Sequence, residues 1–218
     1  MKSQKIVPLI ALSLLINLTA MTIAPASIAA KNSNARTSTA SKDSSVVVNE
    51  FQPTVSEEKI GDKTFAVGTI LVKAKPEKIW EILTNYANQP ELFSTVKKCQ
   101  VVEDKGAKKL VRQIVCPKGS PMHFDYIVEI DEVAPKLMEW HRKSGALKDV
   151  SGSWKLEPDA SKHNTILTYS IYIDGGTFLP AWLLRGQSKN QLPDVLNSIK
   201  GAAERASASS ATTGSGAS

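Results

Sequence analysis

The sequence is poor in the residues from which most catalytic and metal centres are built. It has only three His residues among 218, and no three or four His, Cys or carboxylate side chains cluster as metal ligands do. Ser120 lies in KGSP, outside the G-x-S-x-G context of a nucleophile elbow. The Gly pair of DGG at 174–176 is too isolated for a phosphate loop. The sequence therefore predicts no catalytic residue, metal ligand or cofactor, and it favours a binding protein over an enzyme.

Cysteine is also scarce, since Cys99 and Cys116 are the only two. In an oxidising compartment, two cysteines on neighbouring strands could form a disulfide, provided that their Cβ atoms are close and well aligned. Two buried free thiols are the other interpretation. The even number does not decide between them, so both predictions stay open.

No apolar run at the N-terminus is long enough for a full membrane span. Lys2 and Lys5 precede an apolar run from Ile6 to Leu18, and small residues follow at 24–29. This order is the layout of a secretory signal peptide. We therefore expect residues 1–30 to be a signal peptide that is cleaved near 26–30, and the protein to be exported, to a periplasm or the medium. A retained N-terminal anchor is the alternative.

The mature chain has no strong excess of one charge. Removing Lys2 and Lys5 leaves 25 Lys and Arg (27 minus these two) against 21 Asp and Glu. The lysines are scattered, as solvated surface lysines are, rather than gathered into a nucleic-acid-binding patch. The sequence predicts no nucleic-acid partner, while a weak attraction to a membrane surface remains open.

Composition divides the rest of the chain into one domain with two polar flanks. Residues 31–54 hold little apolar material and are expected to be a disordered linker, although VVVNEF at 46–51 could also be an added edge strand. Residues 206–218 are of low complexity and are expected to be a disordered tail. The predicted folded domain is 55–205, an ordinary size for a single core.

Hydrophobic periodicity predicts an α+β domain with a seven-stranded antiparallel sheet. A strand at 63–74 is followed by one or two short helices from Pro76, and a long helix closes the domain from about 179. Short Gly-, Pro- or Asp-bearing turns separate the six strands between, which implies antiparallel hairpins. These six runs are 94–104, 108–116, 122–133, 136–145, 150–158 and 164–174.

The terminal helix is expected to cover the concave face of this curved sheet. Pro193 should bend or break the helix, which leaves either a cavity lined by aromatic side chains or a space that those side chains fill. Arg142 and Arg185 are candidate polar anchors at the mouth, with exposed surface positions as the alternative. Period-two alternation and helical spacing predict the lining residues Phe124, Tyr126, Val128, Trp140, Trp154, Tyr169, Ile171, Trp182, Leu183, Leu192 and Leu196.

Three motifs resemble the START-like polyketide cyclase/lipid transport superfamily, also called SRPBCC. They are KPEKIWEILTNYANQPEL, GSWKLEP and the ending GGTFLPAWLLRGQSKNQLPDVLNSIKGAAER. The chain looks most similar to the coenzyme Q-binding protein group, over about residues 63–205. The resemblance implies a helix-grip fold and a hydrophobic ligand, such as a lipid or quinone, held between sheet and C-terminal helix. The export signal departs from the quinone-binding proteins.

The function expected from these observations is that of a carrier or binding protein for a hydrophobic small molecule, without chemical change. A cyclase, dehydratase or isomerase acting on a polyketide-like substrate is one alternative, and it predicts a His, Asp or Arg inside the cavity. A protein- or membrane-interaction module is another, and it predicts an open apolar groove.

Overall fold

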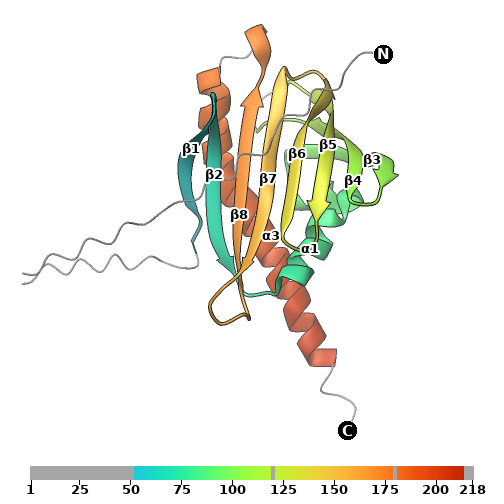
Figure 1. Ribbon diagram of the computed structural model, residues 1–218, viewed down its shortest axis with the longest axis vertical. Coiled ribbons are helices and arrows are strands. Elements are labelled where there is room, and N and C mark those ends of the chain that lie inside the picture. Colours follow the sequence, from blue (N-terminus) through green and yellow to red (C-terminus); the bar gives the residue numbers. More distant parts are fainter. Residues whose placement is uncertain (1–51, 119–120, 179–180, 214–218) are drawn as a thin grey trace, which may run out of the picture. The chain divides into compact units, whose positions relative to one another are not determined.

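The computed structural model describes residues 52–118, 121–178 and 181–213, without the side chains of 178, 181–188 and 210–213 (Figure 1). The expected signal peptide, 1–30, and most of the expected linker, 31–54, lie outside these residues. The described chain forms one antiparallel sheet and one long helix, with short helical segments α1 (Pro76–Thr84), η1 (Tyr86–Asn88), α2 (Gln89–Leu92) and η2 (Gly176–Phe178).

The sheet has eight strands in the order β1-β2-β8-β7-β6-β5-β4-β3, all paired antiparallel. Strands β3 to β8 follow one another as hairpins, and β8 closes back onto β2, so the chain needs only one crossover. The strands are β1 (Thr54–Ile60), β2 (Lys63–Val72), β3 (Val96–Lys105), β4 (Lys108–Val115), β5 (Phe124–Val133), β6 (Leu137–Gly145), β7 (Asp149–Pro158) and β8 (Thr165–Asp174).

The expectation of seven strands is wrong, because β1 adds an eighth at the edge beside β2. Its side chains are almost all exposed, so TVSEEKI has no apolar alternation to mark it as a strand. Gly61, at φ +63°, makes the tight turn into β2. The short helices consequently follow β2 rather than the first strand, and Thr54, expected as the last residue of the linker, begins β1.

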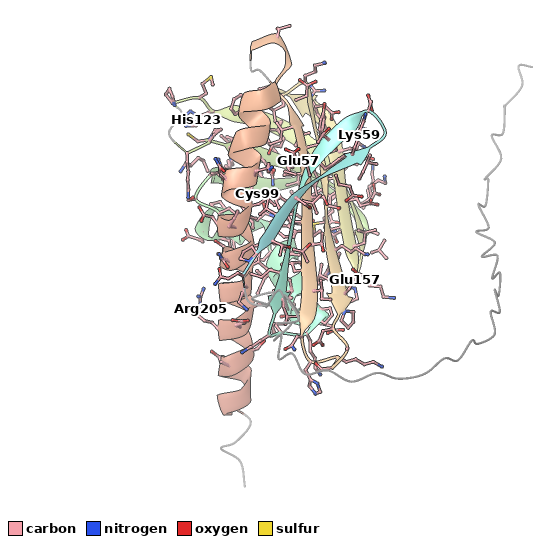
Figure 2. The ribbon with its side chains drawn as sticks, turned by 90° about the vertical axis from the view of Figure 1, so that its left-hand side faces the viewer. Glu57, Lys59, Cys99, His123, Glu157 and Arg205 are labelled. Atoms are coloured by element: carbon pink, nitrogen blue, oxygen red, sulfur yellow. The ribbon has the colours of Figure 1, made fainter. Side chains whose placement is uncertain are left out.

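Helix α3 (Ala181–Thr213) lies along the inner face of the sheet, as the side view in Figure 2 shows. Its apolar stripe of Leu192, Leu196 and Ile199 is at most 1% exposed. The helix packs mainly against β2 and β8. Gly68 on β2 permits this approach, because a Cβ there would lie 2.7 Å from Leu196 Cδ1 and 2.8 Å from Leu192 Cδ2. The helix is therefore pressed onto one half of the sheet.

Helix α3 is continuous through Pro193 and extends beyond the predicted domain end at 205. The prediction that residues 206–218 form a disordered tail is wrong for 206–213, and 214–218 lie outside the described residues. Alanine has the highest helix propensity, Ala203 is fully buried, and the Ser207 hydroxyl donates a hydrogen bond to the Ala203 carbonyl oxygen. Among the described residues, no helix is both long and apolar enough to cross a membrane.

Candidate functional site

A cavity of about 170 Å³ lies between the inner face of the sheet, the short helices and α3. Strands β3 to β8 all contribute residues to its wall, and Gln191, Leu192 and Val195 of α3 border it as well. Its apolar wall is formed by Phe93, Val96, Val115, Val128, Ile130, Met138, Val150, Ile171, Ile173, Leu192 and Val195.

Three aromatic rings make a nearly flat floor on one side of the cavity. Tyr169 stacks on Trp154 with ring centroids 4.2 Å apart, and Trp140 continues the layer at 5.9 Å from Tyr169. Gly152 makes room for this layer, because a Cβ at that position would lie 2.4 Å from the Trp140 ring. Adjacent strands thus present one continuous aromatic surface, against which a flat apolar group can pack.

A chain of neutral polar side chains from β5, β4 and α2 borders the cavity. The Tyr126 hydroxyl donates to Gln113 Oε1 at 3.0 Å, and Gln113 Nε2 donates to Gln89 Oε1 at 3.1 Å. Gln89, on α2, is only 8% exposed. Because each amide or hydroxyl passes its hydrogen bond onward, the chain ends on the Gln89 amide nitrogen.

The tyrosines of the cavity stay protonated at neutral pH. Burial raises the pKa of Tyr126, and the neighbouring Tyr169 raises it further. Burial likewise raises the pKa of Tyr169. In Tyr86, burial and then the hydrogen bond of its hydroxyl to Glu132 Oε1, at 2.5 Å, raise the pKa. These groups can donate hydrogen bonds but do not serve as bases near neutral pH.

Seven of the residues that the sequence predicts as lining border this cavity: Tyr126, Val128, Trp140, Trp154, Tyr169, Ile171 and Leu192. Two others do not border it. Phe124 is half-buried against the core, and Leu196 is fully buried beneath Gly68, where it holds α3 to β2. The side chains of Trp182, Leu183 and Arg185 lie outside the described residues.

Arg142 is not among the residues that line the cavity. Its Nη2 donates to the Gly145 carbonyl oxygen at 2.9 Å. Strand β6 has a register shift here, because Arg142 pairs with Val128 whereas Ser144 pairs with Ile127. Arg142, the expected polar anchor, is instead bound to the end of its own strand. The β-bulge that causes this cannot be predicted from the alternation of apolar and polar residues.

Cys99 and Cys116 are not joined by a disulfide in this structure. Cys99 pairs across the sheet with Gln113, so Cys116 lies three residues further along β4 and its extension. At about 3.3 Å per residue this offset is roughly 10 Å, beyond the reach of a disulfide. Burial raises the pKa of Cys99 to about 11, and the Gln113 amide only partly opposes this.

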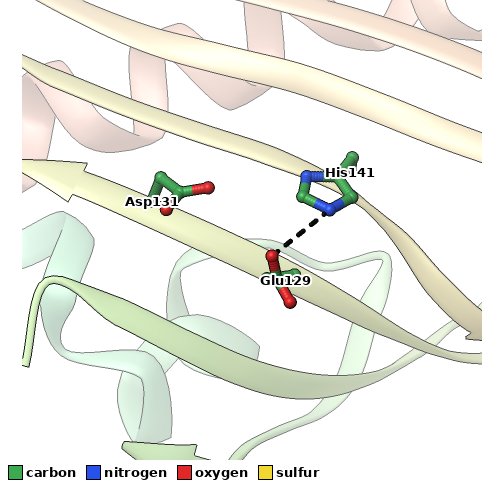
Figure 3. A group of neighbouring side chains, drawn as sticks. All are labelled: Glu129, Asp131 and His141. Carbon is green, nitrogen blue, oxygen red and sulfur yellow. Dashed lines mark ion pairs between the residues drawn. The ribbon is translucent and has the colours of Figure 1, made fainter. Parts of the chain in front are cut away.

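Glu129, Asp131 and His141 come together on the outer face of the sheet, away from the cavity (Figure 3). Glu129 lies 2.9 Å from Lys108 Nζ and 3.2 Å from Lys143 Nζ, and these two ammonium groups lower its pKa to about 2. His141 Nε2 is 3.5 Å from the same carboxylate. The arrangement is that of a surface ion-pair network, in which lysines already neutralise the carboxylates.

The sequence predicts only two of the polar residues of the cavity, Tyr126 and Tyr169. Strand parity could have found Gln113, which shares a face with the buried Val111. Gln89 lies on a helix of one turn, too short for any period to show. Tyr86, Thr95 and Gln191 complete the set. Glutamine usually lies at the surface, so composition offered no signal for these positions.

An antiparallel sheet closed by a long C-terminal helix, with an apolar cavity between them, defines a START-like ligand-binding domain. The chain belongs to the polyketide cyclase/dehydrase and lipid transport family, whose model matches residues 72–200, more than half of the chain. A search of curated proteins finds no significant match.

Solved structures share this fold at low sequence identity. A STAR-related lipid transfer protein from Xanthomonas axonopodis is 14% identical, with a TM-score of 0.60 over 70% of this chain and 93% of its own. The Zhui aromatase/cyclase from Streptomyces sp. R1128 is 18% identical, with a TM-score of 0.54 over 65% and 93%. Human STARD10 is 13% identical, with a TM-score of 0.57 over 70% and 69%. Identities this low show the fold alone.

Proposed function

We propose that this protein is an exported carrier that binds a hydrophobic small molecule in the cavity between sheet and α3 and releases it unchanged. The observation that carries the proposal is the apolar cavity with its aromatic floor of Trp140, Tyr169 and Trp154. Burying apolar ligand surface there is worth roughly 25 cal/mol per Å². Family membership supports a hydrophobic ligand of the lipid or polyketide-like kind, and a quinone is a further candidate.

The absence of chemical change rests on the chemistry of the lining. Acid–base catalysis needs a group whose pKa lies near the working pH. The described lining residues include no His, Asp, Glu, Lys or Arg, and burial moves the tyrosine pKa values upward. The cavity therefore offers hydrogen bonds and apolar contacts, which orient a ligand rather than transform it.

The cavity volume limits how much of the ligand is enclosed. A dry cavity of about 150 Å³ holds one benzene-sized molecule, so 170 Å³ accommodates a single ring or a short chain end. A full lipid or a tailed quinone must leave its remainder outside, or α3 must move away from the sheet.

Native mass spectrometry of the protein recovered from cells, with organic extraction of any adduct, tests the carrier function. We expect a reproducible apolar adduct that disappears in Val128→Phe, which fills the cavity from β5. Val133→Phe is the matched control, because Val133 is on the same strand but 57% exposed. A clean unliganded mass after exposure to lipid and quinone mixtures would contradict the proposal and favour a protein-interaction function.

The proposed export is tested separately by the N-terminus of the recovered protein. A signal peptide predicts that the chain starts just after residues 26–30, in the periplasmic or extracellular fraction. An intact N-terminus at Met1 in a membrane fraction would favour a retained anchor instead.

A further inference from the structure

The cavity is neutral, and this restricts the ligands that it can take. Its described lining residues include seven polar side chains besides the tryptophans, namely tyrosines, glutamines and a threonine, and none of them is charged. An ionised carboxylate moved into such a site loses its hydration without gaining a cation, which strongly disfavours its binding. A neutral polar group needs only one or two hydrogen bonds to offset its desolvation.

Two donors on the cavity lining have no hydrogen-bond acceptor within the described residues. One is the Tyr169 hydroxyl, on the aromatic floor. The other is the Gln89 amide nitrogen, because Gln89 uses its oxygen to accept from Gln113 and has no second hydrogen bond. Gln89 is more than nine-tenths buried. Neither donor atom is among the fully buried side-chain atoms without a partner, so both are accessible from the cavity. A ligand that covered them without offering an acceptor would desolvate two donors for no gain, so the pair points to an acceptor on the ligand.

The direction of the hydrogen-bond chain explains why the Gln89 amide nitrogen remains available. The Tyr126 hydroxyl donates to Gln113, and Gln113 in turn donates to Gln89, so each amide oxygen already accepts one hydrogen bond. The groups that remain without a partner at the cavity surface are therefore N–H and O–H donors. A ligand oxygen with lone pairs can accept hydrogen bonds from them, whereas an ammonium group would only add further donors.

We propose that the enclosed part of the ligand is a ring-sized apolar group bearing a neutral carbonyl or hydroxyl oxygen, which accepts hydrogen bonds from Tyr169 and Gln89, and that the cavity rejects carboxylates. The ring lies on the floor of Trp140, Tyr169 and Trp154. This inference rests on the proposed carrier function and adds the chemical class of the ligand's buried end.

Three probes share a six-membered ring and differ in the group that it carries. Cyclohexanone carries a carbonyl oxygen, its isostere methylenecyclohexane carries no acceptor, and cyclohexanecarboxylate carries a negative charge. Their dissociation constants are measured at pH 7 on the full chain, from the fluorescence of the tryptophans on the cavity floor. Each is compared between wild type, Tyr169→Phe and Gln89→Leu. The variant Tyr172→Phe is the control, because Tyr172 neighbours Tyr169 in sequence but stacks on the opposite face against Phe65, with ring centroids 5.7 Å apart.

Comparing each variant with the wild type cancels the different water solubilities of the probes. We expect Tyr169→Phe to weaken cyclohexanone roughly fivefold, the equivalent of one net hydrogen bond, and to leave methylenecyclohexane within about twofold. Gln89→Leu should show the same selectivity, and Tyr172→Phe should change neither probe. Cyclohexanecarboxylate should bind at least about tenfold more weakly than the ketone.

The outcomes distinguish this inference from the proposed function. If the ketone and its isostere respond equally to Tyr169→Phe, or if the carboxylate binds as tightly as the ketone, the inference is wrong while the carrier function stands. If none of the three probes binds, the cavity takes no ring-sized ligand and both are overturned. Tyr169→Phe should fold normally, because the hydroxyl that it removes has no partner among the described residues.

Discussion

Replacing Gly68 by alanine should destabilise the protein, although alanine is normally the better residue in a strand. The new Cβ would lie 2.7 Å from Leu196 and 2.8 Å from Leu192, whose side chains are at most 1% exposed. Overpacking of this kind costs about 1–3 kcal/mol. Relief of the backbone entropy of glycine offsets about 0.5–1 kcal/mol. The net expectation is a loss of about 1–2 kcal/mol in the free energy of unfolding.

Urea unfolding followed by tryptophan fluorescence measures this loss directly, and thermal unfolding should show a decrease in Tm of roughly 2–8 °C. Gly201→Ala is the matched control on α3. Its Cβ would approach only the flexible end of Arg205, at 3.1 Å, and alanine favours a helix interior by about 0.5–1 kcal/mol. The same substitution should therefore stabilise at one site and destabilise at the other.

A double-mutant cycle tests whether the crowding is the cause. In the Leu196→Ala background one of the two close contacts is gone, so Gly68→Ala should cost roughly half as much, a coupling of at least about 0.5 kcal/mol. If Gly68→Ala is as stable as wild type in both backgrounds, α3 does not press on β2 at this glycine, and the packing described above is incorrect.

Three further predictions follow from buried and charged groups. Tyr86→Phe should lose about 1–3 kcal/mol in urea unfolding, because it leaves the carboxylate of Glu132 without its hydroxyl donor; an unchanged midpoint would contradict that. The pKa of Glu129 in the folded protein, about 2, lies below its ordinary value of 4.5. The stabilisation that Glu129 contributes is therefore present above about pH 4.5 and is lost as the pH falls toward 2. The difference in unfolding free energy between wild type and Glu129→Gln should shrink over that pH range. In a thiol-reagent titration without reductant, the unfolded protein should yield two reactive thiols. In the native protein Cys99 should react slowly, because it is buried and its pKa is raised. If the unfolded protein yields no reactive thiol, Cys99 and Cys116 are joined by a disulfide.

Strand alternation predicts the inner face well where one side of a strand is buried and the other is solvated. On β5, Tyr126, Val128 and Ile130 are buried while Asp125, Ile127 and Glu129 are more exposed, and the three buried residues all border the cavity. Strand β1 has no such contrast, because its one neighbour is β2 and nearly all its side chains face solvent. Charged residues such as Glu57 and Lys59 are typical of a strand at the edge of a sheet, but they are equally typical of a polar linker.

The expected end of the folded domain at 205 differs from the end of α3 at Thr213 for a related reason. Residues from Ala206 onward are small and polar, a composition that indicates disorder when it stands alone. In the structure, they continue a helix whose preceding turns are fixed by burial of Ile199 and Ala203, so the helix propagates without a costly nucleus. Composition describes a segment in isolation, whereas its structure depends on what precedes it.

The cavity depends on where side chains are missing as much as on where they are present. Gly68 brings α3 down onto β2, so the helix packs against β1, β2 and β8, while η1 and α2 lie mainly against β3 and the inner face of β4 to β7 borders the cavity. Gly152 lets Trp140 lie flat toward Tyr169, so that the aromatic rings form a floor instead of filling the space. The alternation of apolar residues along a strand predicts that one face is buried, but not whether another side chain or a ligand covers it. Here the cavity is left open by Gly68 and Gly152, and the Gln89 amide nitrogen, which has no acceptor among the described residues, borders it.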